Sequence, residues 1–469
     1  MKDKYNLLTL NIHSGFTYMD VMHFLKDNNL LDTSKFEQLF SLFLGKNLTE
    51  KSTILFIDEI NTANCLNLLT DLFTRHSFLS TPLKKNVYII GACNPYRLLL
   101  SKTEEIGYSN KKSHKIRNLV YTVNPLPLSL INYVFDFGNL RDEDEKTYIK
   151  SFIDSFLNEK FSIFNRDNYA NILDKICDSV NFSHTYIRKN NEVSSVSLRE
   201  IKRFTKFFNF FLNIIKRRKE IENNYKIYAE KIKYFVEEIT EEQKKENIIF
   251  LKAANLSLFI SYYLRIIDPK KRKELAKNLS EIFEFDFLEY PLELENVLAN
   301  NVSIDKGIAK NNALLDNLFS MFVCLNNKIP IFICGKAGFS KSLSFSLLYQ
   351  SMNGEYSKTA LLKNYPKIFL TSYQGSLTST SAEIKKIFNI AKKVAKYKSK
   401  QKGKQSLSVI LFDEMGLAEI SPNNPLKVIH SELDENDDNK NDIGFVGISN
   451  WALDASKMNR GVHLSIQEP

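Results

Sequence analysis

The stretch from Ile329 to Ser342 constrains the fold of this chain more than any other. Its apolar run 331–334 predicts a short buried strand, and the run breaks at Gly335. Gly338 and a Lys-Ser pair at 341–342 follow, and then apolar residues recur at helical spacing over 343–350. A strand, a glycine-bearing loop, Lys-Ser and a helix form the arrangement of a phosphate-binding P-loop.

The residue types in this stretch fit the chemistry of phosphate binding. Glycines let the backbone approach phosphate, and loop N–H groups and the helix N-terminus attract the anion. We expect Lys341 to reach the β- and γ-phosphates of ATP and the Ser342 hydroxyl to bind Mg²⁺. The predicted cofactor-binding residues are Gly335, Lys336, Ala337, Gly338, Phe339, Ser340, Lys341 and Ser342.

One position in the loop departs from the usual P-loop pattern. Ser340 stands directly before the lysine, where glycine is usual. Positive φ angles are uncommon for residues other than glycine. Either the loop tolerates serine there, or nucleotide affinity is reduced. The alternative interpretation is a Gly/Ser-rich turn with a chance Lys-Ser pair.

Two apolar runs, predicted to be strands, each end in an Asp-Glu pair. The pairs are Asp58-Glu59 after the run 54–57 and Asp413-Glu414 after the run 407–412. Such a pair is typical of a Walker B element, in which the aspartate holds Mg²⁺ and the glutamate polarises the attacking water. The alternative is that the acids only cap a following helix.

Each Asp-Glu strand is followed by a second predicted strand that ends in asparagine. Asn94 lies 35 residues after Glu59, and Asn450 lies 36 residues after Glu414. A polar residue at such a strand end suits a sensor of the γ-phosphate, although Asn94 also suits a turn before proline. An arginine then precedes a further short β-run in each half of the chain. These arginines are Arg117 and Arg460.

The recurrence of these signals in the same order predicts two copies of one α/β domain. We expect an α/β fold of two tandem P-loop cores, each a parallel sheet with helices on both faces, separated by an all-helical region. The predicted domains are a first core at 1–141 without its P-loop, a helical lid and linker at 142–290, and a second core at 291–469 with the P-loop, truncated before its own lid. On this interpretation the chain is part of a longer protein.

Composition sets broader limits on function. The chain has 469 residues, 43% hydrophobic and 25% charged, which is ordinary for globular protein. Its net charge of +10 comes from lysines spread along the sequence, so it indicates no specific nucleic-acid site. The five cysteines form no CxxC pair, which favours a reducing, cytoplasmic location. The apolar window 248–267 contains two basic residues and an asparagine, so we expect a packed helix there and no transmembrane segment.

This layout resembles the AAA+ ATPases, which place a helical lid after a P-loop core. By that resemblance Asp58-Glu59 and Asp413-Glu414 are Walker B pairs, and Asn94 and Asn450 are sensor 1 residues. Arg199, near the start of a helix capped by Ser197, is similar to a sensor 2 arginine. Arg117 and Arg460 fall where arginine fingers lie. The implied metal ligands are Ser342, Asp413 and Asp58, and the implied catalytic residues are Glu414, Asn450, Glu59, Asn94, Arg460 and Arg117.

Three stretches of the second core narrow the resemblance to one family. The segments 335–342, 413–419 and 444–454, the last together with 457–461, are similar to the mysterin-type giant RING E3 ubiquitin ligases, which carry a dynein-like series of AAA units. Ala92–Arg97 and Asp136–Gly138 are similar to the preceding unit of that family, and Ser340 is itself a family trait. The resemblance implies ubiquitin-protein transferase activity for the longer parent only. A ubiquitin-conjugating E2 enzyme would be a partner through a part absent from this sequence.

The resemblance also implies how the two cores cooperate. Arginine fingers act on a neighbouring unit, so Arg460 is expected to point at the first core's site and Arg117 at the unit before it. Neighbouring AAA units of the same polypeptide are therefore expected partners. The alternative functions are a mechanical AAA+ motor of dynein or midasin type, a scaffold that binds ATP without hydrolysing it, and a nucleic-acid machine. The sequence predicts no specific contact with nucleic acid.

Overall fold

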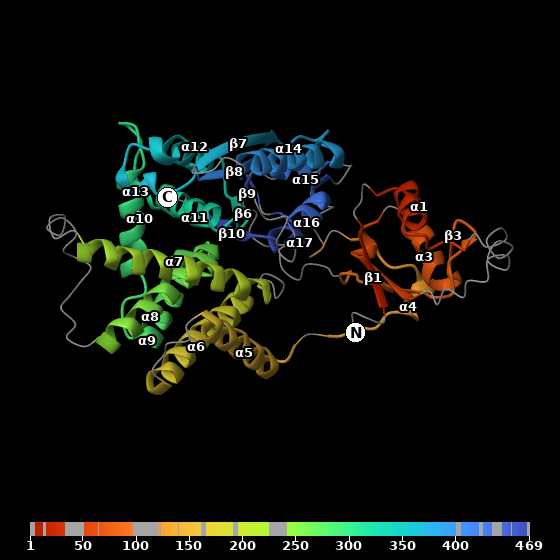
Figure 1. Ribbon diagram of the computed structural model, residues 1–469, viewed down its shortest axis with the longest axis horizontal. Coiled ribbons are helices and arrows are strands. Elements are labelled where there is room, and N and C mark those ends of the chain that lie inside the picture. The colour runs from red at the N-terminus through yellow and green to blue at the C-terminus, as the bar shows by residue number, and fades with distance from the viewer. Residues whose placement is uncertain are drawn as a thin grey trace.

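The computed structural model contains two parallel β-sheets and a large helical region (Figure 1). It describes residues 5–12, 16–32, 51–63, 65–96, 121, 123–138, 140–160, 166–190, 196–224, 242–399, 405–421, 425–433, 443–451 and 453–466. Within these ranges, side chains are described except at 160, 166–168, 216–224, 242–247, 399 and 455. We use the names first core, helical region and second core for residues 1–141, 142–290 and 291–469.

The sheet of the first core has the strand order β1-β2-β5, all parallel. Its strands are β1 (Tyr5–Asn11), β2 (Ser52–Asp58) and β5 (Val87–Gly91). Alternate residues of β2 are buried, as expected of a strand with one face on a core. The helices α1 (Tyr18–Asp27) and α3 (Leu66–Arg75) pack with these strands in a separate apolar cluster. The short strands β3 (Ser77–Phe78) and β4 (Thr81–Pro82) form a hairpin beyond α3.

The helical region follows a short helix, α4 (Leu128–Ile131). Its helices are α5 (Asp142–Lys160), α6 (Arg166–Asn190), α7 (Arg199–Asn224), α8 (Glu242–Ser261), α9 (Pro269–Phe283) and α10 (Glu289–Asn301). Ser197 and Glu200 cap α7 reciprocally, because the Ser197 hydroxyl accepts from the Arg199 N–H and Glu200 accepts from the Ser197 N–H. The phenylalanines of α7 at 204, 207, 208 and 211 are almost fully buried, in agreement with a core role.

The apolar helix α8 is long and hydrophobic enough to cross a membrane by length and composition. Its window Ile248–Arg265 is 78% buried inside the protein, against other helices of the region. Among the described residues, no other helix passes the same test. Burial of this kind is typical of the central helix of a bundle, which agrees with the packed helix expected there.

The second core contains a parallel sheet with the order β10-β6-β9-β8-β7. Its strands are β6 (Ile331–Cys334), β7 (Lys367–Gln374), β8 (Ser406–Asp413), β9 (Ile443–Ser449) and β10 (Val462–Ser465). Both faces are covered, so β6 and β9 are buried at every residue. A parallel sheet covered by helices on both faces fits an AAA domain.

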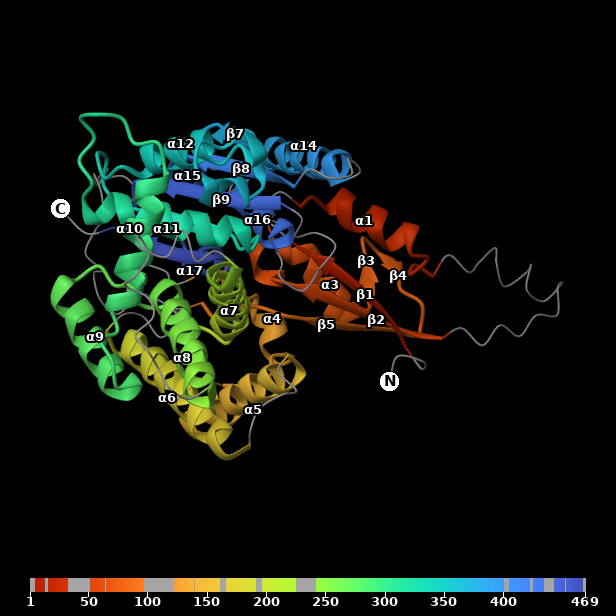
Figure 2. The same ribbon diagram turned by 60° about the vertical axis from the view of Figure 1, so that its left-hand side comes forward.

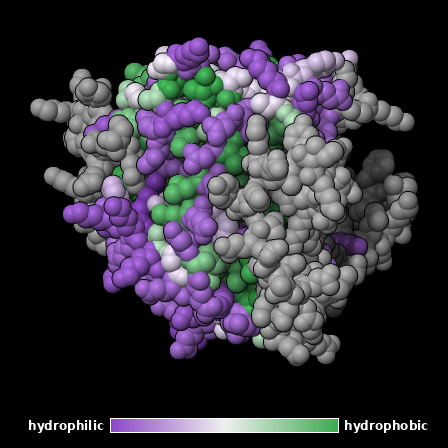
Figure 3. Space-filling model, turned by 90° about the vertical axis from the view of Figure 1, so that its left-hand side faces the viewer, coloured by the Kyte–Doolittle hydropathy of each residue, from purple (hydrophilic) through white to green (hydrophobic). Residues whose placement is uncertain are grey.

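Different helices cover the two faces of this sheet. On one face lie α11 (Asn312–Asn326) and α12 (Lys341–Ser351), whose apolar side chains continue into the cluster formed by the helical region. On the other face lie α14 (Ser381–Ser399), α15 (Met415–Glu419) and α16 (Val428–Glu432). The helical region and the second core therefore share one hydrophobic core. Figure 3 views the end that they form, where apolar side chains lie in a band between hydrophilic ones.

Several sequence predictions of element bounds differ from the structure. The sequence pattern at 61–73 predicts one helix, but the structure has the 3-10 turn η1 (Ile60–Thr62) followed by α3. The helix predicted at 128–135 ends at Ile131, and the one predicted at 247–267 is α8 followed by the 3-10 turn η5 (Tyr263–Arg265). Helix α10 begins at Glu289 and thus crosses the predicted boundary at 290. The short β-run after Arg117 predicts a strand at 120–123, but Tyr121 and Val123 lie in no strand, and residues 120 and 122 are outside the described residues. The sequence also predicts helices at 34–44 and 225–237, and both of these ranges lie outside the described residues.

Candidate functional site

The loop 335–340 joins β6, in the interior of the second sheet, to α12. Lys336, Ala337 and Gly338 are exposed, while Phe339 and Ser340 are half-buried. Gly338 has φ +88°, and Ser340 has φ +56° with ψ +14°, which is the left-handed region. Ser340 therefore adopts the conformation that glycine usually supplies before the lysine of a P-loop.

The Lys341 ammonium lies inside the curve of this loop. Its Nζ donates to the carbonyl oxygens of Gly335 at 2.5 Å and Lys336 at 2.7 Å, and to Oδ1 of Asn450 at 3.1 Å. Burial lowers the pKa of Lys341, and the nearby carboxylates of Glu414 and Asp413 partly oppose that effect. The lysine thus holds the loop closed through bonds that a phosphate group can replace.

Ser342 and Asp413 lie next to each other at the carboxyl edge of the sheet. The Ser342 hydroxyl donates to Oδ2 of Asp413 over 3.3 Å, and the other oxygen of Asp413 accepts from the Glu414 N–H at 2.9 Å. A hydroxyl beside a carboxylate at the mouth of a loop is a donor set that suits Mg²⁺, which prefers oxygen ligands. These residues therefore fit the metal that the sequence implies.

Glu414 follows β8 in a left-handed conformation, with φ +52°. Its two carboxylate oxygens accept from Nδ2 of Asn450 at 3.1 and 3.0 Å. Since Asn450 also accepts from Lys341, one asparagine connects the lysine of the loop 335–341 to the glutamate. The structure thus brings Lys341, Ser342, Asp413, Glu414 and Asn450 together at one edge, where the strand order of an open α/β sheet places its binding crevice.

The first core repeats this local geometry at its own Asp-Glu pair. Glu59 has φ +54°, and its N–H donates to Oδ1 of Asp58 at 3.0 Å, as in the second core. Asn11 pairs with Asp58 across β1 and β2, just as Gln374 pairs with Asp413 across β7 and β8. The carbonyl of Asn94 accepts from the Asn61 amide at 2.8 Å, so the loop after β5 is joined to the turn after β2.

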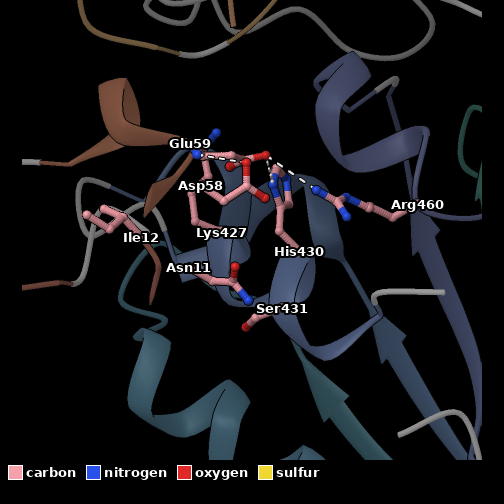
Figure 4. Close-up of a pocket in the computed structure, with 8 residues that line it drawn as sticks. All are labelled: Asn11, Ile12, Asp58, Glu59, Lys427, His430, Ser431 and Arg460. Carbon is pink, nitrogen blue, oxygen red and sulfur yellow. Dashed lines mark hydrogen bonds and ion pairs between the residues drawn. The ribbon is translucent and has the colours of Figure 1, made fainter. Parts of the chain in front are cut away.

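Glu59 contacts the second core, although the two residues involved are about 400 positions away in sequence. Its Oε1 lies 2.6 Å from Nδ1 of His430 on α16 and 3.5 Å from Nη2 of Arg460, which precedes β10 (Figure 4). Lys427 lies beside them, and Asn11, Ile12, Asp58 and Ser431 also line a small pocket there. Figure 2 shows α16 beside the strands of the first core. The predicted direction of Arg460, toward the first core's Asp-Glu pair, matches this position.

Glu59, Lys427, His430 and Arg460 are buried, and burial together with their mutual contacts shifts the pKa of Glu59, His430 and Lys427. Burial raises the pKa of Glu59, but hydrogen bonding to His430 and the charges of Lys427 and Arg460 outweigh burial and lower it to about 2. Burial lowers the pKa of His430 to about 4. At neutral pH, a neutral imidazole therefore donates from Nδ1 to an ionised Glu59. Burial also lowers the pKa of Lys427, next to Lys457.

Sequence patterns did not single out His430, Lys427 or Arg203. His430 and Lys427 lie in a short apolar-looking segment, where nothing in the spacing marks a partner in another domain. Arg203 of α7 is buried and donates from Nη2 to the Asn459 carbonyl at 2.6 Å. Arg199 is exposed at the first residue of α7, one helical turn before Arg203. Arg117 lies outside the described residues.

Comparison with known proteins shows which proteins this sequence is similar to. Residues 307–469 match the model of the RNF213 AAA domain. The chain is 32% identical over 454 residues to the E3 ubiquitin-protein ligase RNF213 of Homo sapiens, covering 91% of this chain and 8% of that protein. It is 31% identical over 499 residues to the E3 ubiquitin-protein ligase rnf213-beta of Danio rerio, and this match covers 100% of this chain and 9% of that protein.

A third relative, the E3 ubiquitin-protein ligase RNF213 of Mus musculus, is 30% identical over 452 residues and shows similar coverage. The chain therefore spans less than a tenth of the length of these relatives. It matches them along nearly its whole length, and the family model falls on the second core, which holds the loop 335–340 and the Asp413-Glu414 pair. Over nearly its whole length the chain is thus an RNF213-type, or mysterin-type, segment, and its second core carries the match to the RNF213 AAA domain.

Proposed function

We propose that this chain is an ATP-binding and ATP-hydrolysing AAA+ segment of an RNF213-type E3 ubiquitin-protein ligase. The observation that carries the proposal is the meeting of Lys341, Ser342, Asp413, Glu414 and Asn450 at one edge of the second sheet. These five residues come from three separate parts of the sequence. They supply the phosphate, metal and water contacts that phosphoryl transfer requires.

Each residue has a distinct task in the proposed reaction. Bound ATP with Mg²⁺ supplies the transferable phosphoryl group and the metal charge that offsets it. The loop N–H groups from Gly335 to Lys341 and the Lys341 ammonium bind phosphate oxygens, and Ser342 and Asp413 hold the metal. Glu414 orients and polarises the water for in-line attack, while Asn450 fixes the position of Glu414. Lys341 leaves its loop carbonyls when it binds phosphate.

The first core would supply the corresponding residues to a nucleotide site of its own. Asp58 and Glu59 are the proposed Walker B pair, Asn94 the sensor 1 residue and Arg199 the sensor 2 residue. Arg460 acts on this site from the second core, and its 3.5 Å approach to Glu59 supports that assignment. Residues 142–290 then form the lid of the first core, with 1–141 and 291–469 as the two AAA+ cores. Arg117 would act on the preceding unit.

The wider function is proposed from the relatives' printed names. They are E3 ubiquitin-protein ligases, so we infer that the full-length protein transfers ubiquitin, with an E2 enzyme as partner, in the cytoplasm. ATP turnover in this segment would alter the angle between core and lid and so control that distant activity. A dynein-like motor without ligase activity and a non-hydrolysing ATP scaffold are the alternatives.

Nucleotide binding by the 469-residue chain tests the proposal directly. We expect calorimetric titration with ATP and Mg²⁺ to detect one site, which Lys341→Ala weakens by at least about tenfold, because a charge-assisted phosphate contact is lost. Lys363→Ala removes an exposed lysine at the end of α13 (Ala360–Lys363) and should leave the affinity unchanged. Absence of binding by the wild-type chain would refute the proposal. Binding with turnover that is insensitive to Glu414→Gln in the full-length protein would favour the scaffold.

A further inference from the structure

The two Asp-Glu pairs have the same backbone geometry, but their glutamates have different partners. In the second core, Asn450 of the same core donates to both oxygens of Glu414. In the first core, Oε1 of Glu59 contacts His430 and Arg460 of the other core. The residue that fixes the glutamate is therefore supplied within the unit in one case and by the neighbouring core in the other.

We propose that His430 is a positioning residue supplied by the second core, and that it orients Glu59 for water activation in the first core's nucleotide site. This inference rests on the proposed function of that site. It assigns His430 a task separate from that of Arg460. Arg460 has to turn from Glu59 to phosphate when it acts as an arginine finger, and His430 is then the partner that remains on the carboxylate.

The geometry of the carboxylate supports this role. Oε1 carries both contacts, while Oε2 is buried and has no hydrogen-bond partner among the described residues. A glutamate that polarises water has to be held in place by a fixed partner, as Asn450 holds Glu414 and His430 holds Glu59. Glu59 therefore has the arrangement of an oriented base, and it lines a pocket that Asp58 and Asn11 also line.

The position of His430 is itself firmly fixed. Its ring is buried, and α16 packs through Val428 and Ile429 on the cluster beneath α14. At the end of α16, Glu432 forms an ion pair with Lys392 of α14 at 2.5 Å. Nε2 of His430 has no hydrogen-bond partner among the described residues, so the bond from Nδ1 to Glu59 is the contact that the ring makes with a charged group. A side chain held in this way can orient a partner without moving itself.

The pocket is too small for a nucleotide in the present arrangement. It has room for about one water molecule. Three buried donors surround it, namely Lys427, His430 and Arg460, and the carboxylates of Asp58 and Glu59 face them. Entry of a phosphate group would therefore require Arg460 to release Glu59. On the proposed role, His430 keeps its contact with the carboxylate from the separate element α16.

The test uses ATP turnover by the full-length protein, in a Glu414→Gln background that silences the second core's site. We expect His430→Ala to lower kcat by roughly 10- to 100-fold with little change in KM, because the base is misplaced but nucleotide contacts remain. His430→Asn places an amide nitrogen where Nδ1 lies and should restore most of the turnover. His430→Gln places the amide nitrogen near the position of Nε2 and should not restore the turnover.

A matched control distinguishes a loss of kcat that comes from misplacing Glu59 from a loss that removal of any buried histidine would cause. His184 of α6 makes the same type of contact, with Nδ1 3.3 Å from Oε1 of Glu145, inside the helical region. His184→Ala should leave kcat unchanged. If Glu59→Gln in the same background does not lower turnover, the proposed function of the first site is wrong. If Glu59→Gln abolishes turnover but His430→Ala does not lower kcat, only the role of His430 is refuted. The same conclusion follows if His430→Asn and His430→Gln have the same kcat.

Discussion

A buried carboxylate between two arginines joins the helical region to the second core. Oε1 of Glu200 accepts from Arg203 and Arg265, each at 3.0 Å, and the three side chains are at most 5% exposed. The other oxygen of Glu200 accepts from the Ser197 N–H at 2.8 Å and from the Ser197 hydroxyl at 3.0 Å. Arg203 in turn donates to the Asn459 carbonyl at 2.6 Å. Stability of the second core should therefore depend on this carboxylate.

Glu200→Gln tests that dependence with little change of volume. Every neighbour of Glu200 is a donor, so the new amide group faces donors and two buried arginines lose their counter-charge. Breaking a buried ion pair from one side costs about 3–5 kcal/mol, and we expect a value in that range. Arg203→Met should cost less, about 2–3 kcal/mol, because Arg265 still pairs with Glu200 while the bonds to Glu200 and Asn459 are lost.

Urea unfolding followed by tryptophan fluorescence provides the assay. The sequence has one tryptophan, Trp451, which follows β9 and whose ring packs on Gly416, so the signal reports the second core. Arg75→Met is the control, since Arg75 is largely exposed and pairs with Asp71 one helical turn away, so the change should alter stability by less than about 1 kcal/mol. If Glu200→Gln costs no more than Arg203→Met, the carboxylate is not the centre of the network.

Two other predictions concern pH and backbone space. Burial lowers the pKa of His430 to about 4 and that of His463 to about 3. Despite burial, hydrogen bonds and nearby positive charges lower the pKa of Glu59, Glu145 and Glu200 to about 2. As the pH falls, these groups therefore take up protons in the unfolded chain at a higher pH than in the folded chain. Stability should therefore fall as the pH drops from about 6.5, and fall further from 4.5 to 2; equal urea midpoints at pH 7 and pH 5.5 would contradict this. Gly375→Ala places a Cβ atom 2.4 Å from the Glu414 carbonyl oxygen, so we expect a kcat loss of about tenfold or more in ATP turnover by the second site, with ATP affinity retained.

The sequence allowed the strand ends of both cores to be predicted, because local patterns encode them. Apolar runs that end in Asp-Glu or Asn place polar side chains at the carboxyl edge of a parallel sheet, and the structure has strands β2, β8 and β9 there. The backbone requirement at Ser340 also follows from one missing glycine, and its φ of +56° meets that requirement. Contacts between distant segments carry no such local signal. His430 and Arg203 were missed because their partners, Glu59 and the Asn459 carbonyl, lie 371 and 256 residues away.

These long-range contacts connect the helical region to the first core's site through very few residues. Arg203 of α7 donates to the carbonyl of Asn459, and the next residue, Arg460, reaches Glu59. A rotation of α7 relative to β10 therefore breaks the Arg203 bond or moves the backbone that carries Arg460. Because Glu59 also contacts His430, which α16 carries on the opposite face of the second sheet, we expect such a motion to shift Arg460 and to leave the His430 contact in place. The two contacts on one carboxylate oxygen thus respond to different parts of the molecule, Arg460 to the helical region and His430 to α14 and α16.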